Sequence, residues 1–322
     1  MRHLNSPAAM LRPHAELCRS AGMRFERVLG VIAVFAAAIA FTASAFCAEI
    51  ALDTARIEKL TGLKGTANAQ EGVFKVSFPR KDIAATVAGV RVIPDMGLSA
   101  WAAFTRAGDH TMVMGDIVLL ENEVSPVMSA ALDNGLEITA LHNHFAWDSP
   151  RILFMHISGM GDEERLASAV GQVFGTLKKL IANPLGPPTA NIDVGQAAFD
   201  PSSIEQTLGT AGTLSNGVYK VVIGRKTTMG EHQIGKDMGV NTWAAFAGSD
   251  KRAVVDGDFA MLEGEVQGVL KALRAGGINV VAIHNHMIGE SPRYVFLHYW
   301  GIGPVRDLAN TLKAAHDTQS GH

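Results

Sequence analysis

A repeat with an offset of 142 residues is the feature that most constrains how this chain folds. Residues 95–161 align without a gap with residues 237–303, and 28 of these 67 positions are identical. Upstream, Gly-Val-Phe-Lys at 72–75 matches Gly-Val-Tyr-Lys at 217–220 after a small insertion. Two copies are too few for a solenoid, which needs at least about three repeats. The chain is therefore expected to contain one domain duplicated in tandem, as a pseudo-twofold pair.

The boundary between the copies can be located from composition. A chain of 322 residues allows about two domains. The segment Asn-Pro-Leu-Gly-Pro-Pro at 183–188 ends a helical pattern, and small and polar residues follow it. We therefore predict a first repeat at 49–182, a linker at 183–203 and a second repeat at 204–322.

The N-terminal segment has the pattern of a secretory signal peptide. Arg24 and Arg27 precede an apolar run at 28–46 that ends in small residues. Met23 is the better candidate for the true start, because a compact charged segment follows it directly. We expect residues 1–48 to be removed on export, which leaves no transmembrane span and a periplasmic or envelope-associated protein. The alternative is a retained membrane anchor, since about 19 apolar residues are long enough to span a bilayer.

Cysteine content and charge exclude several classes of function. The two cysteines, Cys18 and Cys47, both lie in or before the predicted signal peptide, so the mature chain has no disulfide and no thiolate metal site. The formal net charge of −3 argues against a nucleic-acid partner. We expect a small molecule or a metal ion as the partner instead.

The two repeats are expected to contain the same order of elements, which is three strands, a helix, two strands and a helix. This order predicts an α+β fold with a largely antiparallel sheet. The short loop between the last two strands favours a hairpin. The predicted strands are 73–78, 99–105, 112–120, 137–144 and 151–158, then 218–223, 241–246, 253–262, 279–286 and 293–300; the predicted helices are 123–134 and 163–181, then 265–275 and 304–316.

The polar motif His-Asn-His at 142–144 recurs at 284–286, and in both copies Ser-Pro-Arg and a third histidine follow at the same spacing. Polar residues are costly to bury unpaired, so their repetition indicates a functional site. On a strand, side chains at i and i+2 share a face, which places His142 beside His144. Whether His156 shares that face depends on the register of the hairpin, because a slip of one residue reverses the answer.

Two or three histidines with a carboxylate suit zinc, manganese or iron. Asp116, Glu121 and Glu123 are alternative carboxylates in the first repeat. A histidine-lined pocket for an organic ligand and a structural hydrogen-bond network are the other interpretations. The candidate metal ligands are His142, His144, His156 and Asp148 in the first repeat, and His284, His286, His298 and Glu290 in the second.

Arg151 and Arg293 follow a turn proline and are candidate ligand-binding residues, together with Asn143 and Asn285. An arginine there can hold a carboxylate or phosphate group through two hydrogen bonds. The alternative is a salt bridge to a nearby acid such as Glu121. The methionines at 96, 112, 114, 128, 155 and 160 are expected to fill the core.

Three functions are compatible with these residues. The first is a binding protein for a metal or a small anion, which the retention of both motifs favours. The second is a metal-dependent enzyme, hydrolytic or cupin-like, in which Asp148 or Glu123 serves as ligand or general base. The third is a structural envelope protein. A nuclease of the HNH type is excluded, because its signature residues are spread along the chain and here they are contiguous.

The chain resembles the LppY/LpqO-like family of bacterial envelope proteins. The resemblance is carried by Asp-Met-Gly at 95–97, Trp-Ala-Ala-Phe at 101–104, Gly-Asp at 115–116, Leu-His-Asn-His at 141–144 and Ser-Pro-Arg at 149–151, with their counterparts in the second repeat. It implies export and a duplicated domain. It implies no activity, because the family is itself of unknown function.

Overall fold

The computed structural model describes residues 51–195 and 197–319. The predicted signal peptide, Cys18 and Cys47 lie outside these residues. Within the described ranges, no helix is both long enough and apolar enough to cross a membrane.

Twelve strands form one antiparallel sheet, in the order β1-β2-β5-β6-β9-β7-β16-β18-β15-β14-β11-β10. Read inward from its two edges, the order is the same in both repeats, which confirms the predicted α+β fold and the tandem duplication. The first repeat contributes β1 (Gly65–Asn68), β2 (Val73–Pro79), β5 (Ser99–Ala107), β6 (His110–Leu120), β7 (Glu137–Asn143) and β9 (Ile152–Gly161). The second contributes β10 (Thr213–Ser215), β11 (Val218–Gly224), β14 (Asn241–Ser249), β15 (Arg252–Leu262), β16 (Asn279–His284) and β18 (Tyr294–Gly303).

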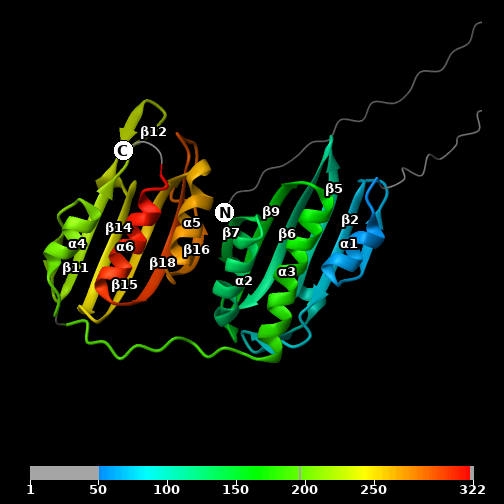
Figure 1. Cartoon of the computed structure of the whole chain (residues 1–322), viewed down its shortest axis with the longest axis horizontal. Coiled ribbons are helices and arrows are strands. Elements are labelled where there is room, and N and C mark those ends of the chain that lie inside the picture. Colours follow the sequence, from blue (N-terminus) through cyan, green and yellow to red (C-terminus); the bar gives the residue numbers. More distant parts are fainter. Residues whose placement is uncertain (1–50, 196, 320–322) are drawn as a thin grey trace, which may run out of the picture. The chain divides into compact units, whose positions relative to one another are not determined.

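Helices cover one face of the strands in each repeat (Figure 1). They are α1 (Thr54–Thr61), α2 (Glu121–Asp133) and α3 (Glu163–Ala182), then α4 (Pro201–Leu208), α5 (Val266–Ala275) and α6 (Val305–His316). Alternation along each strand buries one row of side chains under these helices, as Ala100, Ala102 and Phe104 show on β5. The intervening row forms a second face, called the open face below. Helices α1 and α4 were not predicted, and α4 begins inside the range expected to be linker.

In each repeat, one small three-stranded sheet holds the loop that follows the histidine motif. The sheet of the first repeat consists of β3 (Ala85–Val87), β4 (Val90–Val92) and β8 (Asp148–Ser149). The sheet of the second repeat consists of β12 (Thr227–Met229), β13 (His232–Ile234) and β17 (Glu290–Ser291). Short 3₁₀ turns, η1 (Pro94–Met96) and η2 (Lys236–Met238), precede β5 and β14, and η3 (Glu263–Glu265) precedes α5.

A buried ion pair anchors the helix that follows the third long strand of each repeat. The Arg80 guanidinium is fully buried and lies 2.8 Å from the Glu123 carboxylate. Glu123 also accepts the backbone N–H of Leu120 at 2.7 Å, which satisfies one of the donors exposed at the start of α2. Arg225 and Glu265 form the equivalent pair at 2.9 Å. Glu123, which the sequence offered as an alternative metal ligand, thus forms an ion pair with Arg80.

A β-bulge decides which face the histidines occupy. In the β7–β9 pair the register shifts between Ile138 and Ala140, so Thr139 is an extra residue on β7. After the bulge, Ala140 lies opposite His156, and His142 follows two residues later on the same face. The β16–β18 pair has the same irregularity.

Candidate metal centre

Three neighbouring strands bring an acid and two histidines together on the open face of the first repeat. Asp116 on β6 lies directly opposite His156 on β9. His142 on β7 is the diagonal neighbour of His156 and lies on the same face. The register thus settles the question that the sequence left open. In the second repeat, Asp258 lies opposite His298, with His284 in the equivalent place on β16.

The remaining histidine of each motif lies beyond the end of its strand, so strand alternation does not orient it. His286 is held instead by the turn that contains the repeated Asp-Met-Gly, where its Nδ1 lies 3.2 Å from the Gly239 carbonyl oxygen. A carbonyl only accepts hydrogen bonds, so this contact needs a proton on Nδ1, and the contact of Nε2 with Asp258 Oδ2 at 3.3 Å then needs a second proton or a cation between the two atoms. In the first repeat, the His144 ring packs on Gly97, where an added Cβ would lie 3.3 Å from Cε1.

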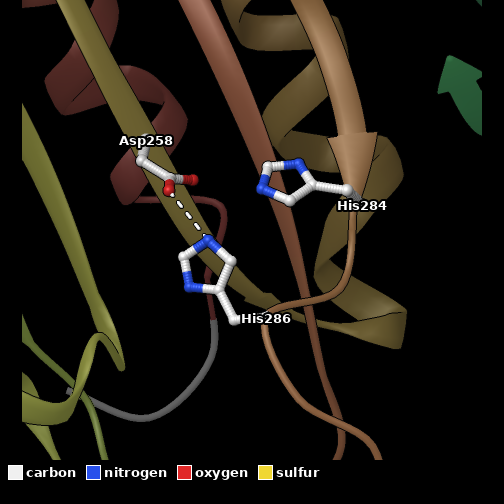
Figure 2. A group of neighbouring side chains, drawn as sticks. All are labelled: Asp258, His284 and His286. Carbon is white, nitrogen blue, oxygen red and sulfur yellow. Dashed lines mark ion pairs between the residues drawn. The ribbon is translucent and has the colours of Figure 1, made fainter. Parts of the chain in front are cut away.

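Figure 2 shows Asp258, His284 and His286 converging, with His284 at the end of β16 and His286 in the loop after it. One ligand atom from each of the three lies within 4.8 Å of the others, so the group can hold a metal ion. His286 Nε2 is 3.3 Å from Asp258 Oδ2, and His298 Nδ1 is 3.8 Å from the same oxygen. Two ligand atoms on one zinc ion lie at most about 4 Å apart, so small side-chain rotations would close the set.

Burial gives this group unusual protonation behaviour. Asp258 is 2% exposed, and within the described part of the chain its Oδ1 has no hydrogen-bond partner. Burial raises the pKa of Asp258 to about 6, against the attraction of His298 and His286. Burial also lowers the pKa of His284 to about 4, helped by repulsion from the other two imidazoles. At neutral pH the group is therefore a carboxylate beside a neutral His284 imidazole, and these are the forms that bind metals.

The first repeat has a related arrangement. His142 Nε2 lies 3.0 Å from His156 Nε2, and His142 Nδ1 lies 3.0 Å from the Asn143 carbonyl oxygen. Bonds of 2.0–2.1 Å in tetrahedral geometry would place two such nitrogens about 3.3 Å apart on one zinc ion. Asp116 Oδ1 is buried without a hydrogen-bond partner among the described residues. Burial raises the pKa of Asp116, against the attraction of His156, His142 and His144.

Asp148 and Glu290, the carboxylates predicted as metal ligands, each accept a backbone hydrogen bond through one oxygen, and among the described residues Glu290 Oε2 has no hydrogen-bond partner. Asp148 Oδ2 accepts the backbone N–H of Ile152 at 2.7 Å, and Glu290 Oε1 accepts that of Tyr294 at 3.1 Å. Both acids lie on the short strands β8 and β17 and cap the strands that follow. The group that can hold a metal in the second repeat contains Asp258 as its carboxylate.

In both repeats this carboxylate belongs to a Gly-Asp pair, and the two residues of the pair lie on opposite faces of the sheet. A Cβ at Gly257 would lie 2.1 Å from the Tyr299 hydroxyl, and one at Gly115 would lie 2.7 Å from the Trp101 carbonyl oxygen. Each glycine is therefore required for packing. The aspartate beside it faces the opposite side of the sheet, into the histidine group.

The predicted ligand-binding arginines each lie near an exposed acid. Arg151 Nε is 3.9 Å from Glu121, and Arg293 Nη1 is 3.6 Å from Glu263. Neither belongs to the group of ligand atoms around Asp258. Each arginine lines a cavity with the asparagine of its own motif, Asn143 with Arg151 in one of about 660 Å³ and Asn285 with Arg293 in one of about 570 Å³.

A lysine and a tryptophan extend the open face beyond the acid. Trp101 on β5 lies directly opposite Asp116, and the Lys75 ammonium lies 4.1 Å from the centre of its ring. Trp243 and Lys220 repeat this contact at the same distance in the second repeat. Both are cation–π pairs, and both tryptophans lie on the open face rather than in the core under the helices.

Fold and site define a protein with two tandem α+β domains and a histidine–aspartate group on the open face of each. The chain belongs to the family described as Domain of Unknown Function (DUF1259), which matches it twice, at residues 55–175 and 202–318. A search of curated proteins found no match.

Two solved structures were compared with this chain. One is a double-ringed trimeric shell protein from the RMM microcompartment, at 10% identity over 68% of this chain and 86% of that chain, with a TM-score of 0.20. The other is the trimeric bacterial microcompartment shell protein PduB, at 12% identity over 79% of this chain and 89% of that chain, with a TM-score of 0.18.

Proposed function

We propose that this chain is an exported envelope protein that binds one divalent metal ion, zinc, manganese or iron, in each repeat. The observation that carries the proposal is the Asp258 carboxylate, which is buried beside three imidazoles while its Oδ1 has no hydrogen-bond partner within residues 51–195 and 197–319. A buried carboxylate without a partner is costly. A divalent cation supplies both the opposite charge and the missing partner.

The orientation of the imidazoles supports the same conclusion. The Gly239 carbonyl holds Nδ1 of His286, so that Nε2 faces Asp258 Oδ2 at 3.3 Å and a metal ion between them would bind both atoms. In the first repeat the Asn143 carbonyl holds Nδ1 of His142, whose Nε2 faces His156 Nε2 at 3.0 Å. Metal-binding histidines usually donate their second ring N–H to such a partner, which fixes both the tautomer and the ring orientation.

Export is supported by the sequence. A charged segment precedes the apolar run at 28–46, residues 48–322 contain no cysteine, and the motifs resemble the LppY/LpqO-like family of envelope proteins. N-terminal sequencing of the protein from an envelope or periplasmic fraction should find a start after Ala45 or Ala48. A cytosolic protein that retains Met23 would contradict export.

Metal binding is tested on protein purified without a histidine tag. Elemental analysis, followed by chelator stripping and titration with zinc, manganese and ferrous ions, should give two equivalents for the wild type. The double variant His142→Ala plus His144→Ala should lose one equivalent, and His284→Ala plus His286→Ala should lose the other. His232→Ala, an exposed histidine on β13, is the matched control and should keep both. If the wild type binds none of these ions, the proposal fails.

A hydrolytic enzyme is the second candidate, and the exposure of the site favours it. The His298 side chain is 44% exposed, so water and small substrates can reach the metal position. A metal-bound water there would be a nucleophile at neutral pH. The open sheet, whose edges are β1 and β10, differs from the closed double sheet expected of a cupin. Hydrolysis of ester or phosphoester substrates by zinc-loaded protein, reduced by Asp258→Asn and abolished when Asp116→Asn is added, would establish this activity.

A further inference from the structure

Three methionines gather on the open face of the first repeat, at the end of β6 and β9 away from the histidine motif. Met112 on β6 lies directly opposite Met160 on β9, and Met114 follows two residues after Met112. Alternation places all three on the same face as Asp116 and His156. Side chains directly opposite each other have Cβ atoms roughly 5 Å apart, within reach of long thioether side chains.

These methionines do not fill the core, contrary to the sequence prediction. Met114 is 54% exposed and Met160 is 63% exposed, whereas Met128 and Met155 are fully buried. Met128 and Met155 are thus the methionines of this repeat that pack in the core. The exposed thioethers therefore call for another explanation.

The second repeat lacks this cluster. The positions equivalent to the three methionines, at the offset of 142, hold Val254, Asp256 and Ile302. The neighbouring histidines and aspartate are identical in both repeats, so the difference is confined to one end of the open face. The methionines thus give the first repeat a chemistry that the second does not have.

We propose that Met112, Met114 and Met160 form a binding site for monovalent copper, separate from the divalent-metal group. Thioether sulfur is a soft, neutral ligand that selects Cu(I), whereas carboxylate and imidazole suit the harder divalent ions. His110 lies on the same face of β6, two residues before Met112, and is exposed. The strand thus presents His-x-Met-x-Met along one face, with Met160 across from its centre, and offers an imidazole as a fourth ligand.

The site is tested with the full chain under anaerobic conditions, by competition for Cu(I) against a chromophoric chelator. Silver(I) serves as a redox-inert probe in a parallel titration. The wild type should bind one monovalent ion at the cluster, and the triple variant Met112→Leu, Met114→Leu and Met160→Leu should bind it about tenfold or more weakly. Leucine keeps the size and apolar character of methionine, so the variant should fold.

Two controls separate this site from the histidine group. Met229→Leu, which removes an exposed methionine of the second repeat, should leave Cu(I) affinity unchanged. The variant His142→Ala plus His144→Ala should keep Cu(I) binding, and the triple methionine variant should keep its zinc stoichiometry. If the triple variant binds Cu(I) as tightly as the wild type, or if only the histidine variant loses it, the proposal is overturned.

Discussion

The histidine groups of the two repeats contain the same residue types but differ in how the acid and the imidazoles meet. In the second repeat the carboxylate of Asp258 is almost fully buried and lies 3.3 Å from His286 Nε2. In the first repeat the close contact joins two imidazoles, His142 and His156, at 3.0 Å. Duplication has therefore copied the ligands without copying their arrangement.

One neighbouring side chain also differs between the two histidine groups. In the first repeat, the ring of His144 stacks on Phe145 with centroids 4.9 Å apart, and it stands edge-on to Phe154 on β9. In the second repeat, the position of Phe145 holds Met287, and His286 lies flat on Phe296 at 3.5 Å. The flat position turns Nε2 towards the acid. We therefore expect ligand geometry to depend on residues that carry no metal chemistry.

The largest expected effect concerns the buried arginines rather than the histidines. Arg80→Leu should destabilise the protein by about 3–5 kcal/mol, because it leaves the Glu123 carboxylate buried without its cation. Arg225→Leu should cost less, because Glu265 also accepts a hydrogen bond from Gln319 at 3.1 Å.

Urea denaturation of both variants measures this difference between the repeats. Arg91→Leu, an exposed arginine on β4, is the control and should have almost no effect. Equal losses in the Arg80 and Arg225 variants would show that the two ion pairs are equivalent in energy.

Asp258→Asn should remove metal binding from the second repeat and stabilise the metal-free protein at pH 8, by roughly 1–3 kcal/mol. The folded-state pKa of Asp258 is about 6, above its ordinary value of 3.8, so its contribution to stability is lost as pH rises from about 4 to 6. The gain from the variant should therefore shrink towards pH 4. Asp116→Asn should give a smaller gain, because Asp116 is less buried. Denaturation in chelator at several pH values would contradict this if Asp258→Asn were destabilising at pH 8.

His284→Gln should change the pH dependence in the opposite direction. Burial holds the pKa of His284 at about 4 in the folded protein. On acidification, His284 therefore becomes protonated near pH 6.5 in the unfolded chain but stays neutral in the folded protein until about pH 4. The stability contribution of His284 is therefore present above pH 6.5 and is lost as pH falls to about 4. Thermal melting of the metal-free protein should show a smaller loss on acidification in His284→Gln than in the wild type. An identical pH profile would place the proton uptake elsewhere.

The smallest expected effect comes from exchanging Phe145 and Met287, the residues that directly follow the two His-Asn-His motifs. Phe145→Met should free His144 to lie flat and should strengthen zinc binding in the first repeat by roughly threefold, less than 1 kcal/mol. Met287→Phe should weaken the second repeat to a similar extent. Titration of each variant in a background where the other repeat carries the double histidine substitution isolates the site. Unchanged affinities would show that the stacking partner does not govern the site.

Much of the fold could be predicted from sequence, because the signals are local. Alternating apolar residues located the long strands to within a few residues, as β2, β6 and β11 show. The 142-residue offset predicted the shared strand order. The short strands β3, β4, β12 and β13 were missed, since three residues are too few to show a period.

The site was less predictable because it depends on pairing between strands. His142 and His156 were identified from their repetition, but the partnership of Asp116 with His156 follows from the β6–β9 register, which no local pattern encodes. Asp148 lies much nearer in sequence to the histidines, and it caps β9 instead. Arg80 was missed because a lone arginine between strands gives no sign that it will be buried.

The bulge in β7 acts as a reading frame for the sheet. Thr139 is the extra residue, and the side chains after it alternate one place out of phase with those before it. If Thr139 paired with His156 instead of bulging out, every later residue would move one place along the strand, His142 would turn towards the helices, and Asn143 would take its place on the open face. Every ligand would still be encoded, yet the histidine group of the first repeat would be gone. The chemistry of this domain is therefore stored partly in the spacing of its backbone and not only in the residues that would touch a metal.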